Sequence, residues 1–170
     1  MLICLVAGLI SLFFTQAQSL KKYPIGNSGC SFYNYCESKI EVDYSTDSSK
    51  VYTGECTVNG VAYGVICVKL FIQVEDLDDA EELMISYLDH LKTSFVITKA
   101  SGYGKGQKLK DNPQARGVVD YWRDNENDYW KIKSWTDGKF IGFMYAYSKK
   151  ELPTQKVDVF LESFRLPKSP

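Results

Sequence analysis

The feature that most limits the fold of this 170-residue chain is a hairpin centred on Asn59-Gly60. Asn-Gly readily adopts the positive φ values of a two-residue type I′ turn, so the flanking segments 51–57 and 61–72 are predicted to pair as antiparallel strands. The second segment is almost continuously apolar. A strand of that composition needs cover on both faces, and we therefore expect it in the centre of a sheet.

A group of aromatic strands is predicted in the second half of the chain. Apolar and aromatic runs separated by turn residues indicate strands at 117–123, 129–135 and 140–147. A tight turn at 137–138 would place Trp135 opposite Phe140 and Trp130 opposite Tyr145, so that aromatic rings meet across the strands. Shorter strands are predicted at 39–44 and 95–100, and the glycine-rich stretch 102–113 is predicted to be an irregular loop.

Two helices complete the predicted elements. The first begins at Asp78, a carboxylate N-cap with Glu81 at the N3 position. Its apolar residues then recur at helical spacing, at Ala80, Leu83, Met84, Tyr87, Leu88 and Leu91. The second is predicted at 152–164, where Pro153 suits a first turn. Antiparallel strands with segregated helices predict an α+β fold, in which an antiparallel β-sheet is flanked by helices.

The first 17 residues predict export. The uncharged apolar run Leu2–Phe14 is too short to cross a hydrocarbon core of ~30 Å, and a small-residue site ending at Ala17 follows it, as in a signal peptide. Cleavage there would leave an irregular, cysteine-containing arm at 18–37 and a single α+β domain at 38–170. We therefore expect a secreted or periplasmic protein without an integral membrane span after cleavage.

Charge and motif spacing disfavour several ligands. A net charge of -1 supplies no field that would attract nucleic acid. The carboxylates at 75–82 lack the spacing of a calcium loop, and the Gly-Lys pair at 104–105 is not followed by the Ser or Thr of a phosphate-binding loop. No cofactor or metal is therefore expected.

The cysteines after the leader are disulfide candidates: Cys30, Cys36, Cys56 and Cys67. Across a two-residue turn, Cys56 and Cys67 share one face of the hairpin but lie about 13 Å apart along it. A disulfide spans at most about 7 Å between Cα atoms, so these two should not bond to each other. Two arrangements remain open. Either Cys30 bonds to Cys36 while the hairpin cysteines stay buried thiols, or the arm lies along the hairpin and is bonded to it at both ends. The spacings and the predicted export disfavour a zinc site.

The segment Phe160-Leu161-Glu162-Ser163-Phe164-Arg165-Leu166, with the order of the predicted elements, resembles the PsbP-like family, whose members often close on Phe-Leu-x-Ser-Phe-x-Leu. The likeness covers residues 38–166 and is close at residue level only in this segment. It implies a PsbP-like α/β/α sandwich that works as a noncatalytic domain outside the cytosol. The cysteine-bearing arm departs from the family pattern.

The function expected from these observations is binding without catalysis, to a protein or a cell-envelope partner. Candidate binding residues are the loop lysines Lys105, Lys108 and Lys110 and the aromatic residues Trp122, Tyr129 and Trp135, although packing beneath a helix would also explain the aromatic rings. One alternative is a thiol-dependent hydrolase that pairs Cys56 or Cys67 with His90, the sole histidine. Another is a small-ligand carrier with an aromatic cleft.

Overall fold

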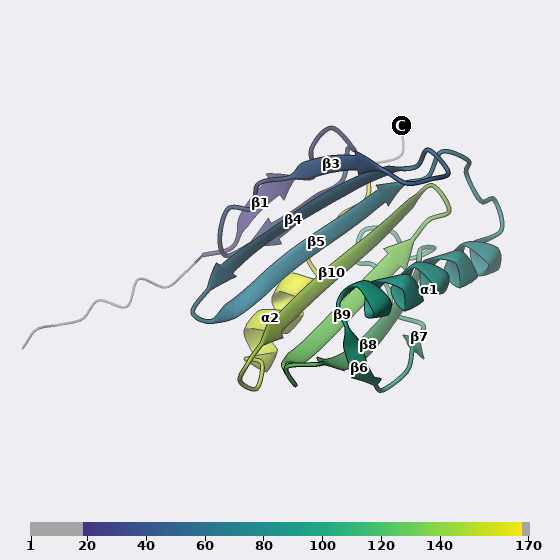
Figure 1. Ribbon diagram of the computed structural model, residues 1–170. Helices are drawn as coiled ribbons and strands as arrows, with labels where there is room; N and C mark the ends of the chain where they lie inside the picture. The colour runs from purple at the N-terminus through teal and green to yellow at the C-terminus, as the bar shows by residue number, and fades with distance from the viewer. Residues whose placement is uncertain (1–18, 168–170) are drawn as a thin grey trace, which may run out of the picture.

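The computed structural model describes residues 19–167, which form an antiparallel sheet with helices on its two faces, as the sequence predicts (Figure 1). The sheet has eight strands within these residues, in the order β3-β4-β5-β10-β9-β8-β6, with β7 also paired to β8. The strands are β3 (Glu41–Tyr44), β4 (Lys50–Val58), β5 (Val61–Lys69), β6 (Ile97–Ala100), β7 (Gly104–Lys105), β8 (Arg116–Asp124), β9 (Tyr129–Thr136) and β10 (Phe140–Ser148). The predicted signal peptide lies outside the described residues.

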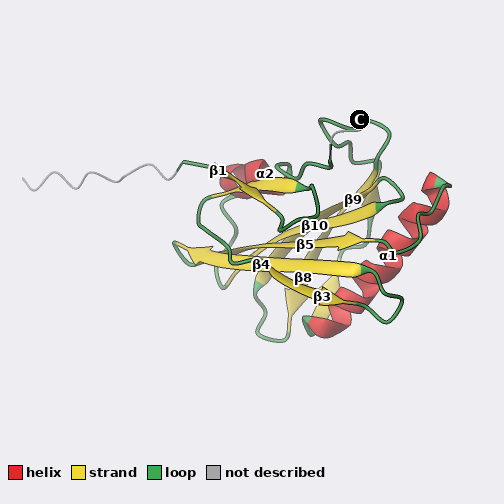
Figure 2. Cartoon of the chain, turned by 90° about the horizontal axis from the view of Figure 1, so that it is seen from above, coloured by secondary structure: helices red, strands yellow, loops and turns green. Residues whose placement is uncertain are grey.

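The sheet separates two apolar layers. Helix α1 (Leu77–Ser94) packs on one face, and helix α2 (Thr154–Leu161) lies on the other face with the arm strands β1 (Lys21–Pro24) and β2 (Ser31–Asn34) (Figure 2). Because successive side chains of a strand point to opposite faces, β5 contributes Ile66 and Val68 to the α1 layer, and Val65 and Cys67 to the α2 layer. The two layers form the core of the described chain.

The Asn59-Gly60 hairpin is confirmed. Asn59 and Gly60 have φ values of 53° and 76°, and Val58 pairs directly with Val61. Strand β5 lies between β4 and β10 and is buried from Val61 to Val68, which confirms its central place. The strand ends at Lys69 instead of the predicted residue 72, because the chain then turns away from the hairpin and leaves the side chains of 71 and 72 exposed.

The predicted pairing of β9 with β10 is wrong by two residues. Trp130 lies opposite Tyr147, and Trp135 lies opposite Gly142. The reason is a wider turn, in which the Asp137 carboxylate accepts hydrogen bonds from the backbone N–H groups of residues 139 and 140. Because side chains alternate with a period of two, the shift keeps every ring on its expected face.

The arm is not irregular, contrary to the sequence prediction. Strands β1 and β2 pair antiparallel from Lys21 opposite Asn34 to Pro24 opposite Ser31. Tertiary contacts supply the order, because Ile25 and Phe32 are fully buried in the core. The backbone of residue 31 also exchanges hydrogen bonds with that of residue 165, at 3.0 and 2.7 Å.

The helices and the glycine-rich loop also differ in detail from the predictions. The N-cap of α1 is Asp76 instead of Asp78, and its carboxylate accepts hydrogen bonds from the N–H groups of residues 78 and 79. The predicted apolar stripe is confirmed, with Ala80, Met84 and Leu88 buried. Helix α2 is shorter than predicted and begins after an N-cap at Pro153. The loop at 102–113 contains β7, which the glycines obscured.

The disulfide of the described chain joins Cys36 to Cys56, with 6.1 Å between their Cα atoms. This pairing overturns the arrangement in which Cys30 bonds to Cys36. Cys67 lies opposite Tyr52 in the hairpin and is not bonded to Cys56, as the register predicts. The arm is thus bonded to the hairpin at one end, while Cys30 and Cys67 are free and buried. Within residues 19–167, no helix is both long and apolar enough to span a membrane.

Candidate binding groove

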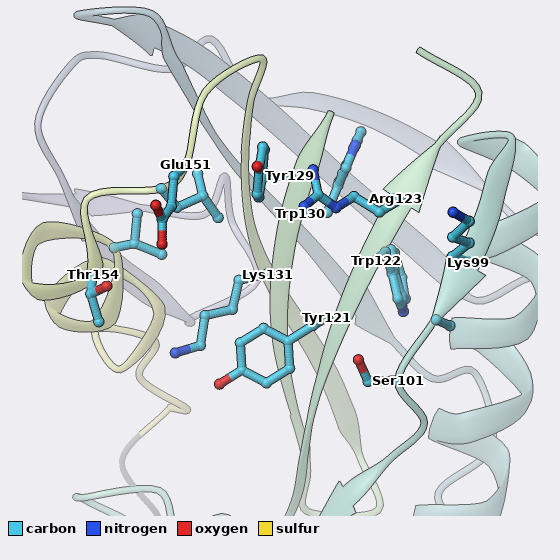
Figure 3. A pocket seen from close by; sticks show the side chains of 13 residues that line it. Lys99, Ser101, Tyr121, Trp122, Arg123, Tyr129, Trp130, Lys131, Glu151 and Thr154 are labelled. Carbon is cyan, nitrogen blue, oxygen red and sulfur yellow. The ribbon is translucent and has the colours of Figure 1, made fainter. Parts of the chain in front are cut away.

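Helix α2 leaves part of its sheet face uncovered, and a groove of about 480 Å³ lies there (Figure 3). The helix buries Val157, Phe160 and Leu161. Two lysines of β9 form ion pairs with it, Lys131 with Asp158 and Lys133 with residue 162. These contacts keep α2 near β9 and leave the neighbouring strand β8 open to solvent. We call this depression the β8–β9 groove, and its polar and aromatic side chains include Lys99, Tyr121, Arg123, Tyr129, Lys131 and Glu151.

Strands β8 and β9 place two tyrosines and two cations in alternation on the floor of the groove. Tyr121 lies opposite Lys131, and Arg123 lies opposite Tyr129. The Arg123 guanidinium carbon is 3.2 Å from the centroid of the Tyr129 ring, and the Lys131 ammonium is 5.1 Å from the centroid of the Tyr121 ring. Tyr121 remains 49% exposed. We call these four residues the tyrosine–cation square.

Hydrogen bonds hold the square in position. The Arg123 guanidinium donates to the carbonyl of Asn127 at 3.0 Å, within the turn that joins β8 to β9. The same turn is organised by Asp124, whose carboxylate accepts from the N–H groups of residues 126 and 128. Burial alone would lower the pKa of Lys131, but hydrogen bonds to Asp158 and Tyr121 raise it above the ordinary value. Lys131 therefore carries a positive charge at neutral pH.

Three cations line the groove: Lys99 of β6 and the two cations of the square. Asp158 offsets the charge of Lys131, and Glu151, just before α2, is the carboxylate in the lining. Figure 3 shows Tyr121 and Lys131 side by side, with Glu151 and Thr154 across from them. The site therefore combines cations with aromatic surface, a set that suits a partner carrying carboxylates and apolar groups.

The aromatic residues predicted to bind a partner do not all reach this surface. Tyr129 belongs to the square, but Trp122 and Trp135 are only 2% and 1% exposed. Trp122 packs in the α1 layer, and Trp135 packs in the opposite layer against Phe164, with parallel rings. Trp122 contributes to the lining of the groove (Figure 3), but packing inside the fold explains both buried tryptophan rings.

The three predicted lysines lie outside the groove. Lys105 belongs to β7 and forms an ion pair with Glu81 at 2.8 Å. Lys108 and Lys110 are exposed on either side of the buried Leu109, which anchors their loop. Lys108 and Lys110 therefore form a separate pair of exposed cations on the same domain.

The cysteines and the histidine of the predicted thiol enzyme are not brought together. Cys56 is oxidised in the disulfide, and Cys67 is fully buried in the layer beneath the arm. His90 is exposed on α1, which packs on the opposite face of the sheet. Among residues 19–167, no group of three or more His, Cys, Asp or Glu side chains is arranged to hold a metal ion.

Sequence reasoning missed most of the groove. Its signal was the alternation of β8 and β9, which places Tyr121 with Arg123, and Tyr129 with Lys131, on one face. Trp122 and Trp130 occupy the other face, in the layer beneath α1.

No protein-family model matches this chain, and no curated protein matches it either. The resemblance to the PsbP-like family therefore stays a prediction from sequence.

Proposed function

We propose that this chain is a noncatalytic binding domain that works outside the cytosol and binds an acidic segment of a partner protein in the β8–β9 groove. The observation that carries the proposal is the tyrosine–cation square, which is positioned by the fold and leaves Tyr121 49% exposed. The Cys36–Cys56 disulfide supports an oxidising compartment.

A protein segment suits the groove better than an isolated carboxylate. The rim includes Lys99 and Ala100 of β6, the terminal strand in the sheet order. An edge strand offers backbone donors and acceptors to an extended peptide, while side chains beside it select the sequence. Acidic side chains of such a peptide would meet the Arg123 guanidinium, which can bind a carboxylate through two parallel hydrogen bonds. Its apolar groups would meet the exposed part of Tyr121.

The test compares the groove with the separate basic loop, using variants that remove equal charge. The groove variant carries Lys99→Gln and Arg123→Gln, and the matched control carries Lys108→Gln and Lys110→Gln. Binding of a short fluorescein-labelled oligoglutamate is measured by fluorescence anisotropy at low ionic strength, after circular dichroism has shown that both variants are folded. We expect the groove variant to lose about tenfold in affinity, or about 1.4 kcal/mol, and the control to stay within about twofold.

Three results would contradict the proposal. A larger loss in the loop variant would move the binding site to the loop that the sequence predicted. Equal losses in both variants would show that only overall charge matters. Direct binding of fluorescein-labelled oligogalacturonate, with no binding of the peptide, would assign the groove to an acidic polysaccharide instead.

A small-ligand carrier is the second candidate function. The groove volume of about 480 Å³ lies within the range of small-molecule sites, roughly 300–1,000 Å³. An aromatic carboxylic acid would bind to the wild-type protein and lose affinity in Tyr121→Ala if the groove serves this purpose. A thiol enzyme has less support, because Cys67 and His90 belong to opposite sides of the sheet.

A further inference from the structure

The free cysteines Cys30 and Cys67 lie where the arm crosses the central hairpin. Cys56 and Cys67 are on the same face of the hairpin, opposite Tyr63 and Tyr52 respectively. The disulfide from Cys36 holds one end of the arm to this face. Strand β2 extends between Cys30 and Cys36. Because this segment is extended, the Cys30 end of the arm reaches the hairpin near Cys67.

Contacts from the segment before Cys30 fix its position over Cys67. The Tyr52 hydroxyl, from the residue opposite Cys67, donates to the Asn27 side chain at 2.8 Å. The N–H of Cys30 donates to the Ser28 hydroxyl at 3.0 Å, and that hydroxyl donates to the carbonyl of Ile25 at 2.7 Å. Cys30 and Cys67 lie in the same buried cluster, and their two thiols interact electrostatically. Both cysteines are almost completely buried, at 2% and 0% exposed.

We propose that Cys30 and Cys67 are a modification site that closes into a second disulfide and locks the arm to the hairpin at both ends. The oxidant is a low-molecular-weight disulfide or the disulfide of a thiol oxidoreductase, as found in oxidising compartments. One thiolate attacks that disulfide and forms a mixed disulfide, releasing one thiol. The second cysteine then displaces the other thiol. A bond between Cys30 and Cys67 forms, the two cysteines lose two protons and two electrons, and the oxidant is reduced to two thiols.

The burial of the pair determines when this reaction takes place. The neighbouring Cys30 thiol, together with burial, raises the pKa of the Cys67 thiol well above its ordinary value. Since the thiolate is the attacking species, the docked arm protects the thiols from reagents. The first attack on the oxidant therefore takes place while the arm is undocked. Docking then brings the second cysteine to the mixed disulfide and shields the new bond from reduction. In this order, the oxidation state of Cys30 and Cys67 depends on the redox conditions under which the chain folds.

The test is a disulfide map of the full chain exported into an oxidising compartment. The protein is unfolded in N-ethylmaleimide without reductant, digested, and analysed by mass spectrometry. We expect a peptide pair linked through Cys30 and Cys67, lighter than the two thiol peptides by two hydrogen atoms, and no maleimide on either cysteine. The Cys36–Cys56 peptide pair serves as the internal control for oxidation.

A second measurement is used when the purified protein still contains reduced Cys30 and Cys67. The purified protein is incubated with oxidised glutathione in enough urea to release the arm, and urea is then removed. Maleimide on both Cys30 and Cys67 after this treatment, with Cys36–Cys56 intact, would overturn the proposal. Cys30→Ser is the matched control, in which Cys67 alone must take up maleimide after unfolding. A linked pair of any other composition in wild type would also overturn it.

Discussion

On each face of the sheet a lysine–carboxylate pair joins β8 or β9 to the helix that packs there, and the two carboxylates have very different surroundings. On the α1 face, Lys92 lies 3.4 Å from Asp120, whose side chain is fully buried. On the α2 face, Lys131 pairs with Asp158, whose side chain is 37% exposed. Each lysine also lies near a tyrosine ring, Lys92 over Tyr103 at 4.1 Å and Lys131 over Tyr121 at 5.1 Å.

The difference lies in how completely each carboxylate is satisfied by the protein. Asp120 accepts hydrogen bonds from the indole N–H of Trp122 at 2.6 Å and from the N–H groups of Gly102 and residue 121. It therefore joins β8 to the loop that follows β6. Burial alone would lower the pKa of Lys92, but its bonds to Tyr103 and Asp120 raise it. The covered face therefore uses its charges for structure. The open face leaves Tyr121 of its square accessible to a partner.

The largest effect is expected from removing the buried carboxylate. Asp120→Ala leaves the Trp122 indole without its acceptor and removes the buried carboxylate beside the Lys92 ammonium, and should lower the free energy of unfolding by about 3–5 kcal/mol. Asp158→Ala on the open face is the matched control and should cost at most about 1 kcal/mol. Urea denaturation measures both. Equal costs on the two faces would remove the distinction between them.

A smaller loss of stability is expected from removing the Cys36–Cys56 disulfide, which joins the arm to the α2 face of the sheet. Replacing Cys36 and Cys56 together by alanine should lower the free energy of unfolding by roughly 2–4 kcal/mol, because the unfolded chain gains conformational freedom. Peptide affinity at the groove should stay within about twofold, since the groove lies on other strands. A parallel loss of affinity would show that the arm and the groove are coupled.

The turn carboxylate Asp124 predicts how stability depends on pH. Burial would raise its pKa, but hydrogen bonds from the Trp130 indole and from backbone N–H groups lower it below the ordinary value. Its contribution is therefore present above the unfolded pKa of about 3.9 and is lost as pH falls through the lower folded value. Asp124→Asn should be less stable than wild type at about pH 7, with a smaller difference at about pH 2. A constant difference across this range would contradict the assignment.

The smallest effect on stability is expected in the square itself. Tyr121→Ala should change the free energy of unfolding by no more than about 0.5 kcal/mol, because half of the ring is already in solvent. Its effect should instead be on binding, which anisotropy measures. A loss of several kcal/mol would show that Tyr121 is a packing residue, like Trp122 on the other face.

The strands and helices could be predicted where local chemistry alone specifies them. Asn59-Gly60 determined a turn, the apolar run after it determined a central strand, and the helical spacing after Asp78 determined an amphipathic helix. The pairing of β9 with β10 was missed by two residues because the Asp137 carboxylate widens the turn through its own hydrogen bonds. The arm was missed because its short strands depend on a distant segment, including the backbone of Arg165.

The sequence by itself determined an antiparallel sheet with helices, the shared face of Cys56 and Cys67, and the alternation that sorts the side chains of β8 and β9. Only the tertiary structure decided that Cys36 is the partner of Cys56, that Trp122 and Trp135 are buried, and that α2 stops short of β8. The physical reason is that alternation assigns a side chain to a face, whereas its exposure depends on which distant element packs over that face.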